Sequence, residues 1–149
     1  MKISRSAILP YSAKNMYDVV ADIPSYPEFL SWCSGVNIVS ETEQEVVAQL
    51  IVAYGVLDFS FTTRNSMQKN QFILLRLVDG PFSDLNGEWA FKALDDNACK
   101  VSLEMDFEFK NSLTRSAFSS VFNKVVGTQL EAFQKRAETV YGAPQYAQY

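Results

Sequence analysis

Residues 99–141 read CKVSLEMDFEFKNSLTRSAFSSVFNKVVGTQLEAFQKRAETVY, and their pattern changes halfway. Apolar side chains first alternate with polar ones, which is typical of an antiparallel strand with one wet face. From about Leu113 to Tyr141 they recur every three or four positions, which predicts one long amphipathic helix of about 40 Å. The strand's apolar residues are Val101, Leu103, Met105, Phe107 and Phe109; the helix's inner positions are Phe118, Val121, Phe122, Val125, Val126, Gln129, Phe133, Ala137 and Val140.

Upstream, the chain reads as one more strand, two short helices and further strands. A strand fits residues 2–9, and Ser12 caps a helix that runs to about Ala21. A second helical turn is predicted from Ser25 to Leu30, with Pro27 near its start. Regularly spaced turn signals then divide residues 33–110 into a meander of about six strands.

This order predicts an α+β helix-grip fold, in which a curved antiparallel sheet of about seven strands wraps around the long C-terminal helix. Two short helices near the N-terminus close one end. We expect one domain over residues 1–149, with a core at about 2–142 and a flexible tail at 143–149. A curved sheet around a straight helix leaves room between them, so the aromatic faces are candidate cavity walls.

Composition excludes several kinds of chemistry. The chain has no histidine, which removes histidine-based catalysis and imidazole metal ligation. A net charge of −4 opposes general nucleic-acid binding, and we expect no DNA partner. Glu104, Asp106 and Glu108 fall on the outward strand face, where solvation explains them better than catalysis. We therefore predict no catalytic residue, no metal site and no cofactor.

The sequence also gives little indication of an oxidising compartment, secretion or membrane insertion. The two cysteines, Cys33 and Cys99, lie far apart and are predicted to be reduced thiols. No run of residues reaches the about 18–20 apolar positions of a membrane span, and the N-terminus lacks a signal-peptide pattern. We expect a cytoplasmic protein.

Two segments carry more aromatic residues than their turns require. Residues 22–33 read DIPSYPEFLSWC and residues 80–91 read GPFSDLNGEWAF. Asp79, Gly80 and Pro81 suffice for a tight turn, yet Phe82 follows at once, with Trp89 and Phe91 beyond it. The two segments either fill the end of the core or line a binding site.

Together with FQKRAETVYG at residues 133–142, these segments resemble the START-like family of coenzyme Q-binding proteins. This is a polyketide cyclase/dehydrase-type branch that includes bacterial ribosome-association toxins. Ser31 stands where the family motif YPxFLPWC has its second proline. The matching positions are Tyr26, Pro27, Phe29, Trp32, Cys33, Gly80, Pro81, Phe82, Leu85, Gly87, Trp89 and Phe91.

The resemblance implies a hydrophobic pocket. We expect Phe82 at its mouth, opposite the loop from Tyr26 to Trp32, and a bend or bulge at Gly87. On this view Phe82→Asp abolishes ligand uptake and leaves the fold nearly intact. The predicted ligand-binding residues are Tyr26, Phe29, Leu30, Trp32, Phe59, Phe61, Phe82, Leu85, Trp89, Phe91, Phe107, Phe118 and Phe122.

Three functional hypotheses follow. The first is non-enzymatic binding of ubiquinone or a similar isoprenoid lipid, as a carrier or chaperone that supports respiration, with transient membrane contact. The second, implied by the toxin branch, is binding to the large ribosomal subunit that blocks subunit association. The third is lyase or cyclase activity, for which the sequence offers no buried acid or base.

For the second hypothesis, the best basic patch for ribosome binding combines Lys110, Arg115, Lys124, Lys135 and Arg136.

Overall fold

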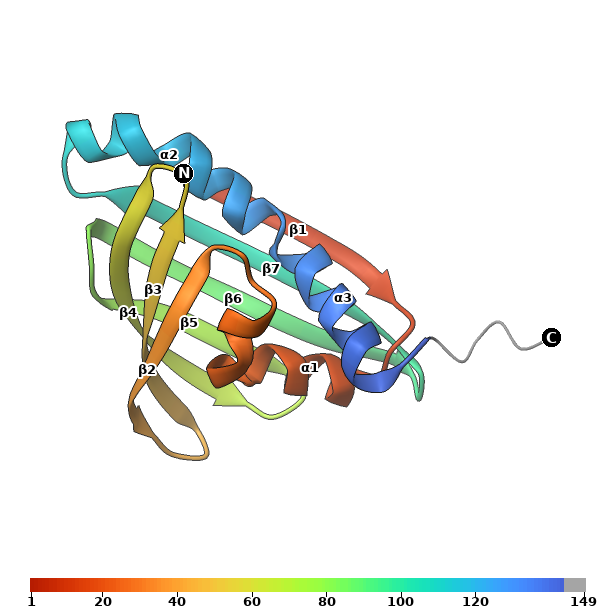
Figure 1. The fold of residues 1–149 in the computed structure, drawn as a ribbon. Helices are drawn as coiled ribbons and strands as arrows, with labels where there is room; N and C mark the ends of the chain where they lie inside the picture. The colour runs from red at the N-terminus through yellow and green to blue at the C-terminus, as the bar shows by residue number, and fades with distance from the viewer. Residues whose placement is uncertain (144–149) are drawn as a thin grey trace.

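The computed structural model describes residues 1–143 and contains one seven-stranded antiparallel sheet. Its order is β1-β7-β6-β5-β4-β3-β2, so six strands form a meander and β1 pairs with the last of them (Figure 1). The predicted tail lies outside the described residues, apart from Ala143. The strands are β1 (Lys2–Leu9), β2 (Cys33–Glu41), β3 (Glu45–Tyr54), β4 (Leu57–Gln68), β5 (Phe72–Asp79), β6 (Phe82–Asp95) and β7 (Ala98–Phe109). The helices are α1 (Ala13–Ala21), the 3-10 helix η1 (Ile23–Glu28), α2 (Ser112–Gly127) and α3 (Gln129–Tyr141).

The two short helices near the N-terminus are confirmed. Ser12 caps α1 by accepting a hydrogen bond from the Asn15 backbone N–H at 3.0 Å. The second helix begins earlier than predicted, at Ile23, with Pro24 in its first turn and Pro27 inside it. Proline fits the start of a helix because the N–H that it lacks would have no partner there.

The predicted single C-terminal helix is broken at Thr128, which corrects the sequence analysis. Three donors converge on the Val125 carbonyl oxygen: the Thr128 backbone N–H at 3.3 Å, Thr128 Oγ1 at 2.9 Å and Gln129 Nε2 at 3.3 Å. Side-chain donors that bind a backbone carbonyl compete with the regular helical hydrogen bond and bend helices. The chain therefore ends α2 and starts α3 in a new direction (Figure 1).

The sheet curves around these two helices, and this confirms the helix-grip fold. In Figure 1, α2 and α3 run diagonally across the sheet, while α1 and η1 lie at the end nearest α3. Edge strand β1 packs against α2 and α3, and edge strand β2 packs against η1. Both apolar faces are thereby buried, as the alternating and helical periodicities require.

The turn between β5 and β6 depends on Gly80. Its φ is 143°, a backbone conformation that residues with a side chain rarely adopt. A Cβ atom at this position would lie 2.7 Å from the Phe61 Cβ atom. The tight turn predicted at Asp79–Pro81 therefore brings the chain directly against β4.

We predict that Gly80→Ala lowers the free energy of unfolding by about 3 kcal/mol or more, because backbone strain adds to the clash with Phe61. Gly55→Ala is the matched control: Gly55 also has a positive φ, of 58°, but has open space around it. It should lose only about 1–2 kcal/mol. Urea unfolding of both variants tests this, and equal losses would contradict it.

Candidate ligand-binding cavity

Phenylalanine rings fill the end of the molecule where α2 begins. Phe82 stacks on Phe109 with ring centroids 4.6 Å apart and lies 5.3 Å from Phe122 and 5.6 Å from Phe61. Ring contacts of this kind add to the free energy that is gained by burying the apolar surface of the rings. We call these rings the phenylalanine cluster: Phe59, Phe61, Phe82, Phe107, Phe109, Phe118 and Phe122.

The expected position of Phe82 at a pocket mouth is wrong. Its side chain is 1% exposed and lies at the centre of the phenylalanine cluster. The Gly80 turn is short enough that β6 begins at residue 82 itself, so the first side chain of the strand already points inward. Phe82 is a core residue, not a gate.

The expected bend or bulge at Gly87 is also wrong. β6 pairs regularly with β7 there, and the register shifts lie at either end of β6 instead. A Cβ atom at Gly87 would lie 2.9 Å from the Glu104 carbonyl oxygen and 3.0 Å from the Met105 sulfur. Close approach of the neighbouring strand, rather than backbone bending, explains this glycine.

A cavity of about 80 Å³ lies between the sheet and the junction of α2 and α3. Its lining is mostly aliphatic and aromatic. Six of its lining residues are among those predicted from the sequence: Tyr26, Trp32, Phe61, Leu85, Trp89 and Phe122. The lining residues that were not predicted are Val20, Ile23, Ala48, Leu50, Thr63, Asn65, Met67, Ile73, Leu75, Leu103, Met105, Val125, Val126, Gln129 and Phe133.

The other predicted site residues do not line this cavity. Phe59, Phe82, Phe107 and Phe118 belong to the phenylalanine cluster. Elsewhere, Phe91 packs edge-on against Tyr17 at 5.6 Å, Leu30 is 3% exposed in the core, and Phe29 lies outside the cavity. Trp89 and Phe91 do point inward from the same strand face, as predicted.

Contacts between η1 and α3 close the cavity on one side. The Phe133 ring lies 5.3 Å from that of Tyr26 and 5.4 Å from that of Phe29. The Arg136 guanidinium stands 4.9 Å from the Phe29 ring centroid and 3.6 Å from the Glu28 carboxylate. Because Glu28 is largely exposed, that ion pair adds little to stability.

Polar groups occupy part of the cavity wall. Thr63 and Asn65 are each 5% exposed on the inner face of β4, and Thr63 Oγ1 donates to Asn65 Oδ1 at 2.8 Å. Gln129 lies on α3, and the buried Trp32 Nε1 has no hydrogen-bond partner. An unsatisfied buried donor costs about 1–3 kcal/mol. The alternation of β4 could have revealed Thr63 and Asn65, because Phe59 and Phe61 point the same way.

Among the described residues, no group that lines the cavity could act as an acid or base near neutral pH. Within residues 1–143, no acidic or basic side chain lines it. Burial raises the pKa of the Tyr26 hydroxyl far above its usual value, and this hydroxyl donates to the Val20 carbonyl. Burial also raises the pKa of the Cys33 thiol, and that of Cys99 to about 11, so both stay protonated. No metal-binding group of side chains occurs in this part of the chain.

Comparison with known proteins agrees with this architecture. The model of the family described as polyketide cyclase/dehydrase and lipid transport matches residues 9–134. The chain belongs to this family. It is 44% identical over 142 residues to the ribosome association toxin RatA of Escherichia coli K12, covering 95% of this chain and 90% of that protein. This finding confirms the resemblance found in the sequence.

Two further matches extend the comparison. The coenzyme Q-binding protein COQ10 homolog B of Xenopus laevis, a mitochondrial protein, is 28% identical over 146 residues. The match covers 95% of this chain and 60% of that protein. The Zhui aromatase/cyclase from a Streptomyces species has the same fold, with a TM-score of 0.83 at 19% identity over 93% of both chains. At that identity the likeness shows the fold alone.

We predict that Phe82→Ala lowers the free energy of unfolding by about 3–5 kcal/mol, because it leaves a void in the phenylalanine cluster. Phe82→Asp should destabilise the fold further, since the carboxylate would be buried without a partner. Leu94→Ala is the control on the same strand: Leu94 is 48% exposed, and its loss should cost within about 0.5 kcal/mol. Chemical denaturation compares the three, and a Phe82→Ala variant as stable as Leu94→Ala would place Phe82 at the surface.

Proposed function

We propose that this protein binds an apolar lipid, ubiquinone being the leading candidate, without catalysing a reaction on it. The observation that carries the proposal is the cavity between sheet and helices, whose wall is mostly aromatic and aliphatic and includes no charged side chain from residues 1–143. Apolar surface moved from water into such a wall gains about 25 cal/mol per Å². The coenzyme Q-binding name of the Xenopus relative supports the choice of ubiquinone.

The cavity must enlarge to hold such a ligand. Sites for small molecules usually measure about 300–1,000 Å³, against about 80 Å³ here. We expect the cavity to open at the contact between η1 and α3. This contact consists of ring contacts around Phe133, the Arg136 guanidinium over the Phe29 ring and the ion pair of Arg136 with the exposed Glu28, whereas contacts among seven rings hold the phenylalanine cluster at the other end.

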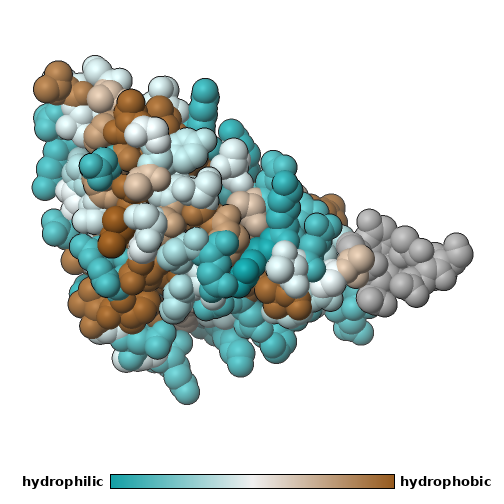
Figure 2. All heavy atoms as spheres, viewed as in Figure 1, coloured by the Kyte–Doolittle hydropathy of each residue, from teal (hydrophilic) through white to brown (hydrophobic). Residues whose placement is uncertain are grey.

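A lipid carrier also needs a surface that can meet a membrane. On edge strand β2, Ile38 is 38% exposed and Val39 is 64% exposed, and Figure 2 shows apolar side chains gathered over this part of the molecule. Exposed apolar patches often mark interaction sites. No helix within residues 1–143 is long and apolar enough to cross a membrane.

The two tryptophans provide a direct test, because Trp32 and Trp89 both line the cavity and the chain has no other. Titration with short-chain ubiquinone should quench their fluorescence saturably. Ala48→Leu should weaken the affinity at least tenfold, since Ala48 lines the cavity and is 1% exposed. Ala53→Leu is the control: it makes the same change at an exposed position of β3 and should bind like the unaltered protein.

Organic extraction of the purified protein, followed by mass spectrometry, independently identifies any lipid that is bound to it. Quinone or another isoprenoid lipid should be recovered. If neither quinone nor lipid is extracted and added ubiquinone causes no saturable quenching, lipid binding is rejected.

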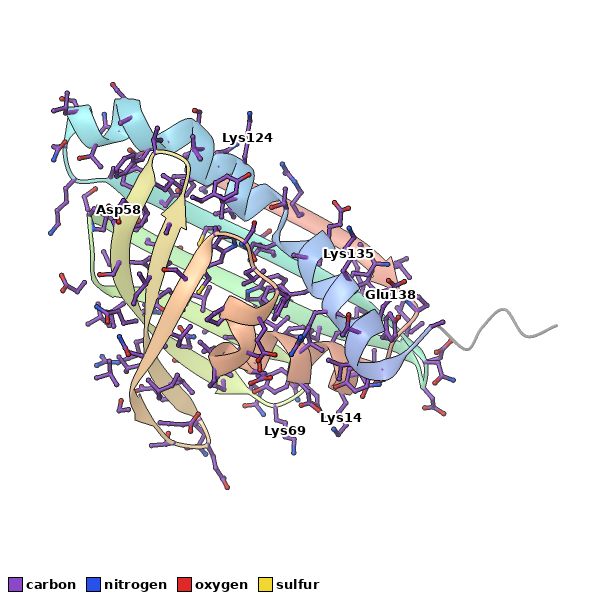
Figure 3. The ribbon with its side chains drawn as sticks, in the orientation of Figure 1. Lys14, Asp58, Lys69, Lys124, Lys135 and Glu138 are labelled. Atoms are coloured by element: carbon purple, nitrogen blue, oxygen red, sulfur yellow. The ribbon has the colours of Figure 1, made fainter. Side chains whose placement is uncertain are left out.

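Ribosome binding is the second candidate function, favoured by the name of the Escherichia coli relative. Here the proposed activity is contact with the large subunit that blocks subunit association. The predicted basic patch is only partly available: Arg115 lies 3.4 Å from the Glu108 carboxylate, and Arg136 is held by Glu28. Lys124 and Lys135 project from the outer side of α2 and α3 (Figure 3). Within residues 1–143, neither lysine has a carboxylate at ion-pair distance.

We predict that overproduction of this protein in a bacterial host increases free subunits in sucrose-gradient sedimentation at low salt. Lys124→Glu combined with Lys135→Glu should reverse this increase, because the helix face would then repel RNA phosphates. Lys100→Glu, which changes an exposed lysine of β7 on the sheet, should have no effect. An unchanged gradient for the unaltered protein would reject the ribosomal activity, whereas Ala48→Leu should leave that activity intact.

A further inference from the structure

We propose that Thr63 and Asn65, together with Gln129 across the cavity, form a hydrogen-bonding site for the head group of the ligand. The site would select an uncharged lipid whose head carries acceptor oxygens, such as a quinone. This inference rests on the proposed lipid-binding function and specifies which part of the cavity recognises the head group of the ligand.

The geometry leaves hydrogen-bond donors available in the cavity wall. Asn65 Oδ1 accepts the 2.8 Å hydrogen bond from Thr63, and the Asn65 amide nitrogen has no hydrogen-bond partner within residues 1–143. From the helix side, Gln129 Nε2 donates one of its two hydrogens to the Val125 carbonyl at 3.3 Å, so its second N–H remains a donor. The two walls therefore offer N–H donors to the same space.

Folding alone does not account for these residues. Thr63 and Asn65 alternate with outward residues on a strand whose other inner positions, such as Leu57 and Phe61, are apolar. Valine and leucine have similar shapes and would bring no polar group into the core. An amide N–H that faces an apolar cavity without a partner is unfavourable unless something else accepts its hydrogen bond. The indole N–H of Trp32, another lining residue, is fully buried and also has no partner.

The same wall discriminates between classes of lipid. A fatty acid or phospholipid would bring a negative charge into a cavity whose described lining has no cation to pair with it. A pure hydrocarbon would leave the Asn65 amide unsatisfied. A neutral ring with carbonyl or ether oxygens satisfies the donors and brings in no charge. Hydrogen-bonding sites reject analogues that lack the matching group because the site's own polar atoms then stay unpaired.

The test compares three probes on the same protein: short-chain ubiquinone, an isoprenoid hydrocarbon of equal chain length, and a fatty acid. The unaltered protein should bind the quinone at least tenfold more tightly than either of the other two. The double variant Thr63→Val with Asn65→Leu should lose this preference over the hydrocarbon and bind the hydrocarbon as well as before. The matched control, Thr62→Val with Asn86→Leu, changes the same residue types at positions outside the cavity and should keep the preference.

A second measurement uses the unaltered protein and does not depend on how the variant folds. The infrared carbonyl band of bound ubiquinone should lie at lower frequency than in a hydrocarbon solvent, because a hydrogen-bonded carbonyl bond is weaker. An unshifted band, or a double variant that keeps the full preference, would overturn the head-group site while leaving lipid binding in place. Failure of the unaltered protein to bind any of the three probes would overturn both.

Discussion

The packing of seven phenylalanine rings between β4, β6, β7 and α2 is the interaction on which the rest of the structure depends. Phe82 sits at its centre, 1% exposed, with Phe109 stacked on it. Because this end of the curved sheet is filled, the remaining free space lies toward the junction of α2 and α3. The position of the cavity is therefore a consequence of where the large rings were placed.

Most of the fold could be predicted because the sequence patterns that indicate it lie within single strands, helices and turns. Strict alternation in β7 shows which face is buried, and turn residues such as Gly80 mark where strands end. The helix break could not be predicted, because it depends on Thr128 and Gln129 both donating to the Val125 carbonyl. Either residue would also be tolerated within a continuous helix.

The candidate site was less predictable than the fold. Aromatic content and the family motifs identified Trp32 and Trp89 as lining residues, yet the same reasoning placed Phe82 at a surface. Sequence patterns show which residues face inward but not where their volumes leave a gap, since that depends on packing between distant segments. Strand alternation places Thr63 and Asn65 on the inner face of β4, but neither aromatic content nor a family motif marks them as lining residues.

The break at Thr128 lies in the helical wall of the cavity, between Val126 on one side and Gln129 on the other. It separates α2, which holds the phenylalanine cluster, from α3, which meets η1 through Phe133. Substitutions in α3 and η1 can therefore accumulate without disturbing the packed end.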